Sequence, residues 1–222
     1  SVVFTYDNII GTHNLLECMR EYNSRDLNEN TGNTGNNGNT GNNGNKFTVI
    51  EKFIHMSTDE VYGEVKLGEP ERTETSLLKP TNPYSATKAG AELLASSYYH
   101  SFKLPIIVVR CNNVFGPRQY PEKVIPAFIY NLLNDDTCKI HGEGQTERHF
   151  IYVDNVVDAL LTIYNKGNVN EIYNIACTEC YKIIDLAKLL IQKLKYQNME
   201  NGQNCTKTDT HLEYVEDKTF ND

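Results

Sequence analysis

Apolar residues follow two spacings along this chain, one typical of buried strands and one typical of amphipathic helices. Short apolar runs rich in β-branched residues predict strands over 52–57, 104–110, 139–141 and 171–175. Apolar residues three and four positions apart predict helices over 4–20, 82–102, 122–133, 154–164 and 183–194. Strands and helices that alternate in this way favour an α/β fold with a parallel sheet.

A low-complexity tract over 28–45 interrupts the pattern, with NTGNNG repeated back to back. It holds almost nothing apolar, so burial cannot offset the entropy of ordering, and we expect a disordered Asn/Gly loop. Gly32, Gly35 and Gly38 have the spacing of a dinucleotide-binding turn. A polar tail precedes them instead of a Val/Ile-rich strand, so we predict that they do not bind phosphate.

Polar side chains gather where the first predicted strand ends, at residues 57–60 (STDE). In an open α/β sheet the carboxyl ends of the strands face the crevice where ligands bind. A polar loop follows, and then Asn82 and Pro83 suit the start of a helix as its N-cap and first residue. Tyr84 and Lys88 come four residues apart on that helix and therefore share one face.

The Tyr84–Lys88 pair suits proton transfer. A free tyrosine has a pKa of about 10, and an ammonium close by favours the phenolate and lowers that pKa. The sequence therefore predicts a tyrosine base supported by a lysine. A surface tyrosine and lysine on an ordinary helix are the structural alternative. The strand ending in STDE shortly before the pair favours the functional interpretation.

Composition disfavours two classes of partner. The chain has 222 residues with 39% hydrophobic content, enough for a sizeable core, and a formal net charge of −8. An acidic protein does not favour nucleic acid or an anionic membrane as a partner. No apolar run is long enough to span a bilayer. The start, SVVFTYDNII, lacks a signal peptide and an initiator Met, and we interpret the chain as a cytoplasmic fragment or an incomplete gene model.

The cysteines predict no metal centre. Cys177 and Cys180 form one isolated C-x-x-C, and zinc would need two more ligands at suitable spacing. Reduced thiols are the simpler interpretation for a cytosolic protein.

Four motifs carry a resemblance to a known family: STDEVYG at 57–63, NPYSATK at 82–88, NNVFGPRQYPEKVIP at 112–126 and EIYNIA at 171–176. The chain resembles the extended short-chain dehydrogenase/reductase superfamily, and within it the dTDP-glucose 4,6-dehydratase type. The resemblance implies NAD as cofactor, a nucleotide-diphosphate sugar as substrate and a possible homodimer. It also implies a partial Rossmann-type, doubly wound parallel sheet with a small C-terminal substrate domain.

The resemblance gives domain limits as well. Residues 1–115 match the C-terminal part of the NAD-binding domain, without its glycine fingerprint. Residues 116–222 match mainly the substrate-binding domain, and 149–166 return to the first domain. Without the fingerprint, we expect the isolated chain to bind little or no NAD.

Roles for individual residues follow from the same resemblance. Thr58, Asp59, Glu60, Tyr84 and Lys88 are the expected catalytic residues. Ser57, Tyr84, Lys88 and Val114 are expected to contact NAD. The expected substrate-binding residues are Asn113, Glu122, Lys123, His141, Arg148, Asn174, Asp217, Lys218 and Asp222. Lys218 stands where the family has arginine, which places diphosphate binding there in doubt because lysine lacks the bidentate fork.

The adjacent acids Asp59 and Glu60 distinguish a dehydratase from its relatives. Elimination of water needs one carboxyl group as acid and one as base, in opposite protonation states. Sugar epimerases and decarboxylases of the superfamily keep the tyrosine and lysine but need no such pair. An epimerase or decarboxylase remains the alternative enzyme, and a catalytically incompetent truncated relative is the non-enzymatic one.

Overall fold

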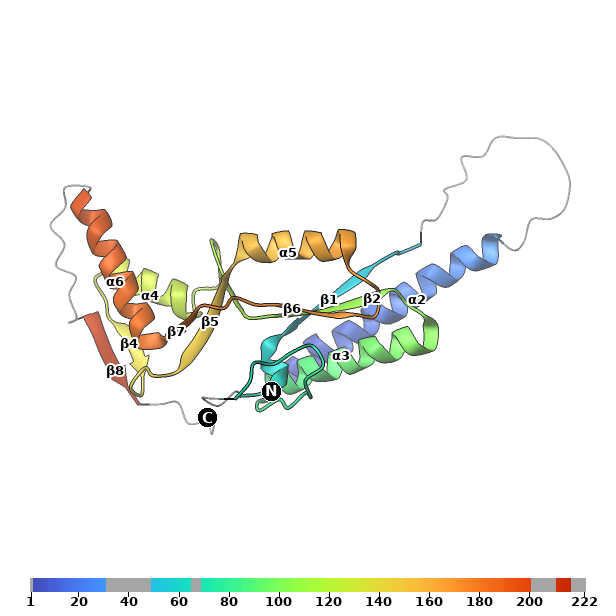
Figure 1. The fold of residues 1–222 in the computed structure, drawn as a ribbon, viewed down its shortest axis with the longest axis horizontal. Coiled ribbons are helices and arrows are strands. Elements are labelled where there is room, and N and C mark those ends of the chain that lie inside the picture. The colour runs from blue at the N-terminus through green and yellow to red at the C-terminus, as the bar shows by residue number, and fades with distance from the viewer. Residues whose placement is uncertain (1, 31–48, 65–68, 201–210, 217–222) are drawn as a thin grey trace, which may run out of the picture. The chain divides into compact units, whose positions relative to one another are not determined.

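The computed structural model describes residues 2–30, 49–64, 69–200 and 211–216 (Figure 1). Contacts divide the chain into two compact units, residues 1–111 with 157–175, and residues 112–156 with 176–222. The α/β fold with parallel strands that the sequence predicts is confirmed. The domain limits at 1–115, 116–222 and 149–166 stay a prediction.

The first unit is built on a parallel sheet with the order β1-β2-β6. Its strands are β1 (Phe53–Thr58), β2 (Ile106–Cys111) and β6 (Ile172–Ile175). β1 and β2 are in register from Phe53 opposite Ile106 to Thr58 opposite Cys111, so both end at the same edge. Every residue of β2 is buried, as a central parallel strand requires.

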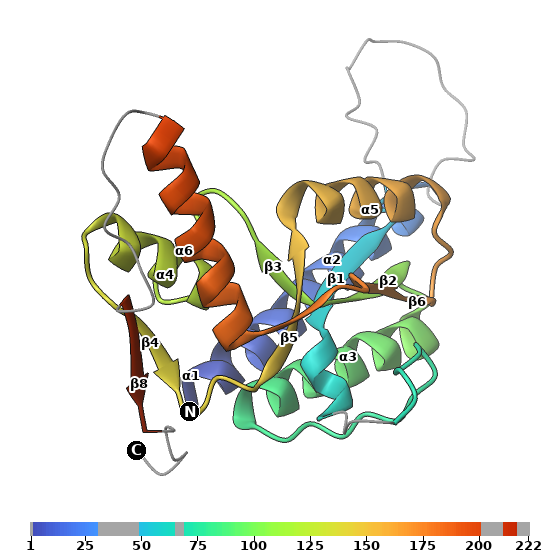
Figure 2. The ribbon, with the colours of Figure 1, turned by 60° about the vertical axis from the view of Figure 1, so that its left-hand side comes forward.

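Helices cover this sheet. One helical stretch comprises α1 (Val2–Phe4), the π-helical η1 (Thr5–Ile10) and α2 (Gly11–Asn30), and α3 (Pro83–Phe102) follows β1. Figures 1 and 2 show α2 and α3 side by side on one face of the sheet and α5 (Val153–Lys166) on the other. The core under α2 and α3 consists of Leu16, Met19, Ala95, Tyr98, Leu104 and Ile106.

The second unit contains a sheet with the order β3-β5-β7 and a separate pair, β4-β8. Its strands are β3 (Asn113–Phe115), β4 (Cys138–His141), β5 (Glu147–Tyr152), β7 (Cys180–Lys182) and β8 (Leu212–Val215). Two helices, α4 (Val124–Leu133) and α6 (Ile183–Glu200), pack on β4. Phe128, Leu132, Cys138, Ile140, Ile184, Ala187 and Ile191 form the core of this unit.

Several predicted elements have other bounds in the structure; the helix predicted over 4–20, for example, continues to Asn30. The strand predicted from residue 104 starts at Ile106, because Pro105 has no N–H to donate and its carbonyl accepts from the Phe53 N–H instead (2.8 Å). Residues 28–30 of the predicted loop form the end of α2. The rest of that loop, with Gly32, Gly35 and Gly38, lies outside the described residues. Among the residues described, no helix is long and apolar enough to cross a membrane.

Candidate active site

The end of β1 turns directly into a short 3-10 helix, η2 (Asp59–Tyr62), which carries the two adjacent acids. Thr58 caps this helix: its hydroxyl oxygen accepts from the Glu60 N–H at 3.3 Å and lies 3.3 Å from an Asp59 carboxylate oxygen, to which it donates. Thr58 is buried, Asp59 is half-buried and Glu60 is exposed. The cap therefore presents both acids at the carboxyl edge of the sheet.

The start of α3 matches its sequence signal. Asn82 accepts from the Ser85 N–H at 2.9 Å, and the Ser85 hydroxyl accepts from the Asn82 N–H at 3.3 Å. This reciprocal cap satisfies two backbone donors that the helix leaves free. The Asn82 amide also donates to a Glu60 carboxylate oxygen at 3.1 Å. The helix with Tyr84 and Lys88 is therefore tied to the acid pair at its first turn.

The predicted catalytic residues Thr58, Asp59, Glu60, Tyr84 and Lys88 all belong to the first unit, and the structure brings them together. The Lys88 ammonium donates to the Met56 carbonyl at 2.6 Å, and this hydrogen bond connects α3 to β1. The charges of Asp59 and Glu60 reach the Tyr84 phenol.

The predicted lowering of the Tyr84 pKa is wrong for this structure. Burial raises the pKa of Tyr84, and the negative charges of Glu60 and Asp59 raise it further. The reason lies in the direction of the lysine, because the Lys88 ammonium bonds a backbone carbonyl rather than the phenol. Burial lowers the pKa of Lys88 itself, against the opposing charge of Glu92.

Two further side chains, Asn8 and His55, belong to the surroundings of Lys88. Asn8 of η1 donates its side-chain amide to the hydroxyl of Thr87, the residue before Lys88, at 2.9 Å. His55 lies in β1, 6% exposed, and its Nε2 has no hydrogen-bond partner among the described residues. Burial, and then the charge of Lys88, lowers the pKa of His55 to about 4. Sequence reasoning missed His55, although a histidine inside a buried strand is itself a signal.

The residues at the end of β1 fit a bound cofactor. The Ser57 hydroxyl is buried and has no hydrogen-bond partner within the described part of the chain. An orphaned buried hydroxyl is costly unless a bound molecule or water satisfies it. Ser57 was one of the predicted NAD contacts. Val114, another, lies in β3 of the second unit.

The second unit holds most of the predicted substrate contacts. Asn113 donates to the His149 carbonyl at 3.2 Å, His141 ends β4 with its Nδ1 3.3 Å from the Glu216 carbonyl oxygen, and Arg148 is exposed on β5. Glu122 and Lys123 directly precede α4. These positions come from separate strands and turns, and their roles stay predictions.

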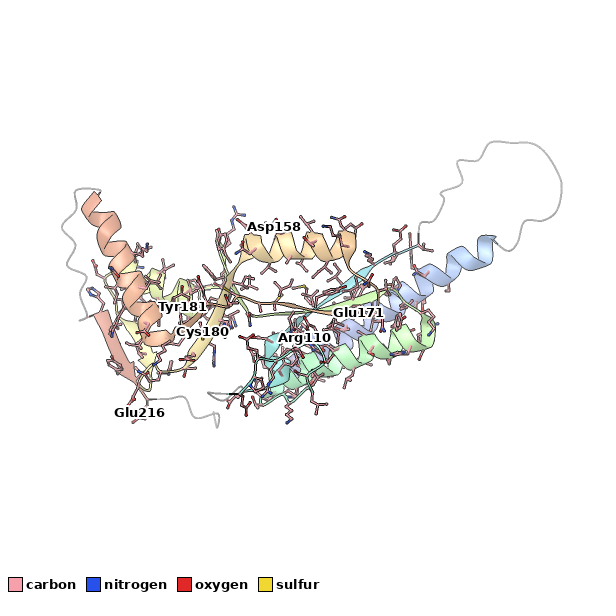
Figure 3. All side chains as sticks on the ribbon, in the orientation of Figure 1. Arg110, Asp158, Glu171, Cys180, Tyr181 and Glu216 are labelled. Atoms are coloured by element: carbon pink, nitrogen blue, oxygen red, sulfur yellow. The ribbon has the colours of Figure 1, made fainter. Side chains whose placement is uncertain are left out.

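Three predicted contacts, Asp217, Lys218 and Asp222, lie outside the described residues. Asn174 belongs to β6 of the first unit, where its side-chain oxygen accepts from the Tyr62 hydroxyl at 2.7 Å. In the described residues, no group of three or more His, Cys, Asp or Glu could hold a metal. Cys180 is exposed on β7, next to Tyr181 (Figure 3).

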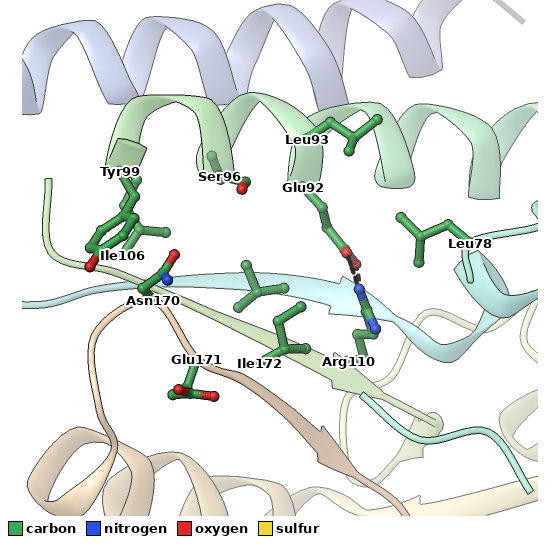
Figure 4. Close-up of a pocket in the computed structure, with 12 residues that line it drawn as sticks. Leu78, Glu92, Leu93, Ser96, Tyr99, Ile106, Arg110, Asn170, Glu171 and Ile172 are labelled. Atoms are coloured by element: carbon green, nitrogen blue, oxygen red, sulfur yellow. Dashed lines mark hydrogen bonds and ion pairs between the residues drawn. The ribbon is translucent and has the colours of Figure 1, made fainter. Parts of the chain in front are cut away.

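Sequence reasoning also missed a buried ion pair between Glu92 of α3 and Arg110 of β2, with side chains 5% and 3% exposed. The sequence offered two signals for it: Arg110 is a charged residue within a buried strand, and Glu92 is an acid one helical turn beyond Lys88. Figure 4 shows the pair in the wall of a cavity of ≈ 160 Å³, together with Leu78, Leu93 and Ile172.

Comparison with known proteins gives one consistent result. The model of the NAD dependent epimerase/dehydratase family matches residues 1–176. A dTDP-D-glucose 4,6-dehydratase of Dictyostelium discoideum is 42% identical over 200 residues, covering 86% of this chain and 40% of that protein. The human protein of the same name is 39% identical over 219 residues, covering 99% of this chain and 53% of the human one. The chain thus spans about half the length of the curated relatives it matches.

Solved structures agree. The dTDP-glucose 4,6-dehydratase of Bacillus anthracis, in complex with NAD, has a TM-score of 0.76 and 32% identity, covering 99% of this chain and 58% of its own. The UDP-glucuronic acid 4-epimerase of Bacillus cereus, in complex with NAD, has a TM-score of 0.67 and 28% identity, covering 95% and 56%. The resemblance to dTDP-glucose 4,6-dehydratases is confirmed, and the chain belongs to the NAD dependent epimerase/dehydratase family.

Proposed function

We propose that this protein is an NAD-dependent NDP-glucose 4,6-dehydratase, with dTDP-glucose as the first candidate substrate and an NDP-4-keto-6-deoxyglucose as product. One observation carries the proposal: η2 presents Asp59 and Glu60 side by side, tied through Asn82 to the helix that bears Tyr84 and Lys88. The dehydratases among the relatives support it.

The first half of the reaction uses Tyr84 as base. Its phenolate removes the proton from the hydroxyl on sugar carbon 4, and the Thr58 hydroxyl hydrogen-bonds the oxygen that develops there. Because burial and the two acids hold the pKa of Tyr84 above its usual value, the phenolate needs a cation. Lys88 supplies that cation when its ammonium turns from the Met56 carbonyl toward the phenol.

The second half uses the two acids. The keto group at carbon 4 acidifies the proton on carbon 5, and ionised Glu60 removes it. Protonated Asp59 gives its proton to the hydroxyl on carbon 6, which leaves as water. NAD, when bound, supplies the hydride chemistry that oxidises carbon 4 and reduces carbon 6.

Binding roles complete the proposal. Ser57, Tyr84, Lys88 and Val114 would hold NAD, and the orphaned Ser57 hydroxyl supports this. Arg148 is the proposed diphosphate ligand, since its planar fork matches phosphate oxygens. The remaining proposed substrate contacts are Asn113, Glu122, Lys123, His141, Asn174, Asp217, Lys218 and Asp222.

We also propose a homodimer formed by the helix bearing Tyr84 and the helix beside it. Exposed apolar side chains support this surface: Ile10 on η1, Leu15 on α2 and Leu93 on α3 are 41%, 58% and 65% exposed. Sedimentation analysis of wild type and of Leu93→Glu tests it, and a monomeric wild type would contradict it.

Mass analysis of the product tests the function. Incubated with dTDP-glucose and with NAD in large excess, because weak NAD binding is expected of this chain, the protein should give a sugar nucleotide that has lost one water. A product of unchanged mass would instead identify an epimerase. Loss of carbon dioxide from a nucleotide-linked uronic acid would identify a decarboxylase. Failure to turn over or bind any nucleotide sugar would contradict the enzymatic proposal.

A further inference from the structure

The Glu92–Arg110 ion pair is the starting point, because it is buried and the proposed reaction does not use it. Arg110 Nε lies 3.1 and 3.2 Å from the two Glu92 carboxylate oxygens, and Nη2 donates to Oε2 at 2.7 Å. A buried ion pair contributes little net stability, since desolvation offsets the attraction, but its geometry is strict. The pair therefore fixes a position more than it adds stability.

The other edge of the same guanidinium holds Tyr62. Arg110 Nη1 donates to the Tyr62 hydroxyl at 2.7 Å, and the guanidinium carbon lies 4.7 Å from the centre of the Tyr62 ring. The Tyr62 hydroxyl in turn donates to the Asn174 side-chain oxygen at 2.7 Å. The phenol oxygen accepts one bond and donates one. With the ring buried at 5% exposure, its orientation is set.

Tyr62 is the last residue of η2, the helix that carries Asp59 and Glu60. Thr58 caps the start of η2, and Tyr62 anchors its end. At the far end of the chain of bonds, Glu92 stands one turn beyond Lys88 on α3. A continuous series of bonds, Glu92 to Arg110 to Tyr62, thus connects the helix of the proposed base with the helix of the proposed acids. Figure 4 shows its first part, the Glu92–Arg110 ion pair.

We propose that Tyr62 is a positioning residue: its hydroxyl, held by Arg110 and Asn174, keeps the Asp59–Glu60 pair in place opposite Tyr84. The catalytic consequence rests on the proposed dehydratase function, whereas the positioning itself does not. If these bonds only stabilised the first unit, weakening them would leave the distance between the Asp59–Glu60 pair and the Tyr84 phenol unchanged.

Tyr62→Phe is the decisive variant, because it keeps the ring and removes the one atom that joins Arg110 to Asn174. Its matched control is Tyr173→Phe, which removes a hydroxyl of β6 that accepts from the Asn168 N–H at 2.9 Å. With dTDP-glucose and NAD, we expect Tyr62→Phe to lower kcat about tenfold to a hundredfold, a larger factor than any change in KM from the released Asn174 side chain. Tyr173→Phe should leave both close to wild type.

A second measurement does not depend on turnover. The charges of Asp59 and Glu60 raise the pKa of Tyr84, so their displacement should lower it. NMR titration of the protein labelled at the tyrosine ring carbon, assigned with Tyr84→Phe, measures that pKa. We expect it to fall in Tyr62→Phe and to stay at the wild-type value in Tyr173→Phe.

The two readouts separate the two proposals. A wild type that releases no water refutes the dehydratase function, and the Tyr84 titration still decides on positioning. If Tyr62→Phe gives the same Tyr84 pKa as Tyr173→Phe, the positioning role is wrong.

Should Tyr62→Phe fail to fold, Arg110→Lys replaces it as the test variant, since lysine keeps the charge beside Glu92 but cannot reach Tyr62 and Glu92 together. The same fall in the Tyr84 pKa is expected.

Discussion

Asn82 donates its side-chain amide to Glu60 at 3.1 Å while its side-chain oxygen caps α3. One side chain thereby joins the start of the helix that bears Tyr84 to one of the two adjacent acids. The relationship explains how residues more than twenty positions apart in sequence reach one site. The side-chain oxygen of Asn82 makes the cap and its amide group makes the contact with Glu60, so substitutions can test the two separately.

Asn82→Ala should lose both functions of this side chain. Loss of an N-cap costs about 0.5–2 kcal/mol of unfolding free energy. Asn82→Ser keeps the cap but is too short to hold Glu60. We expect urea unfolding to show clear destabilisation for the alanine variant and near wild-type stability for the serine variant. Equal stability of the two variants would show that the cap contributes nothing.

Glu60→Gln should block elimination. Glutamine still accepts a hydrogen bond from Asn82, so the change removes the basic charge and leaves the contact in place. We expect dehydration to fall about 10²- to 10⁴-fold, the usual contribution of a general base. Some reduction of NAD should remain, measured by absorbance. Glu64→Gln, an exposed neighbour, is the control, and full turnover by Glu60→Gln would exclude Glu60 as the base.

The pH dependence of the reaction should follow Tyr84. Its pKa is raised by burial and by the charges of Glu60 and Asp59, so the phenol is protonated at neutral pH. The rate of the first step should therefore rise as the pH rises into the alkaline range. Glu60→Gln removes the opposing charge with the larger effect and should shift the rising limb of NAD reduction to lower pH. A limb that does not move in Glu60→Gln would contradict this coupling.

His55 should make the fold sensitive to acid. Its pKa in the folded chain is about 4, below the ordinary histidine value of 6.5, chiefly because burial disfavours the charged ring. The unfolded chain then binds the proton more strongly, so this stability is present above pH 6.5 and is lost as the pH falls toward 4. The loss is on the order of 3 kcal/mol.

Urea unfolding of wild type and His55→Gln between pH 7 and 4 measures this effect. The variant should lose less stability over that range than wild type. His100→Gln, at an exposed position on α3, should follow wild type. Parallel curves for His55→Gln and wild type would refute the assignment to His55.

Gly63 should tolerate no side chain. Its φ of +77° is strained for other residues, and an added Cβ would clash with the Lys79 carbonyl oxygen. Gly63→Ala should therefore destabilise the first unit and displace η2. Circular dichroism during thermal unfolding measures the loss. Gly11→Ala, whose added Cβ would have only an ordinary contact at 3.7 Å, is the matched control.

The sequence predicted most of what depends on local rules. The apolar run before STDE became β1, and Asn82 with Pro83 became the observed helix start. Short strands such as β3, β7 and β8 were not predicted. Three or four residues carry too little pattern, and these strands exist through pairing with distant partners, such as β4 with β8.

The sequence by itself determined the α/β class, the family motifs and the chemical identity of the candidate residues, because residue spacing and caps act over a few positions. Only the tertiary structure decided where the Lys88 ammonium points, that burial raises the Tyr84 pKa, and that Arg110 joins Glu92 to Tyr62. Those properties depend on burial and on contacts between residues far apart in sequence, and no local pattern encodes either one.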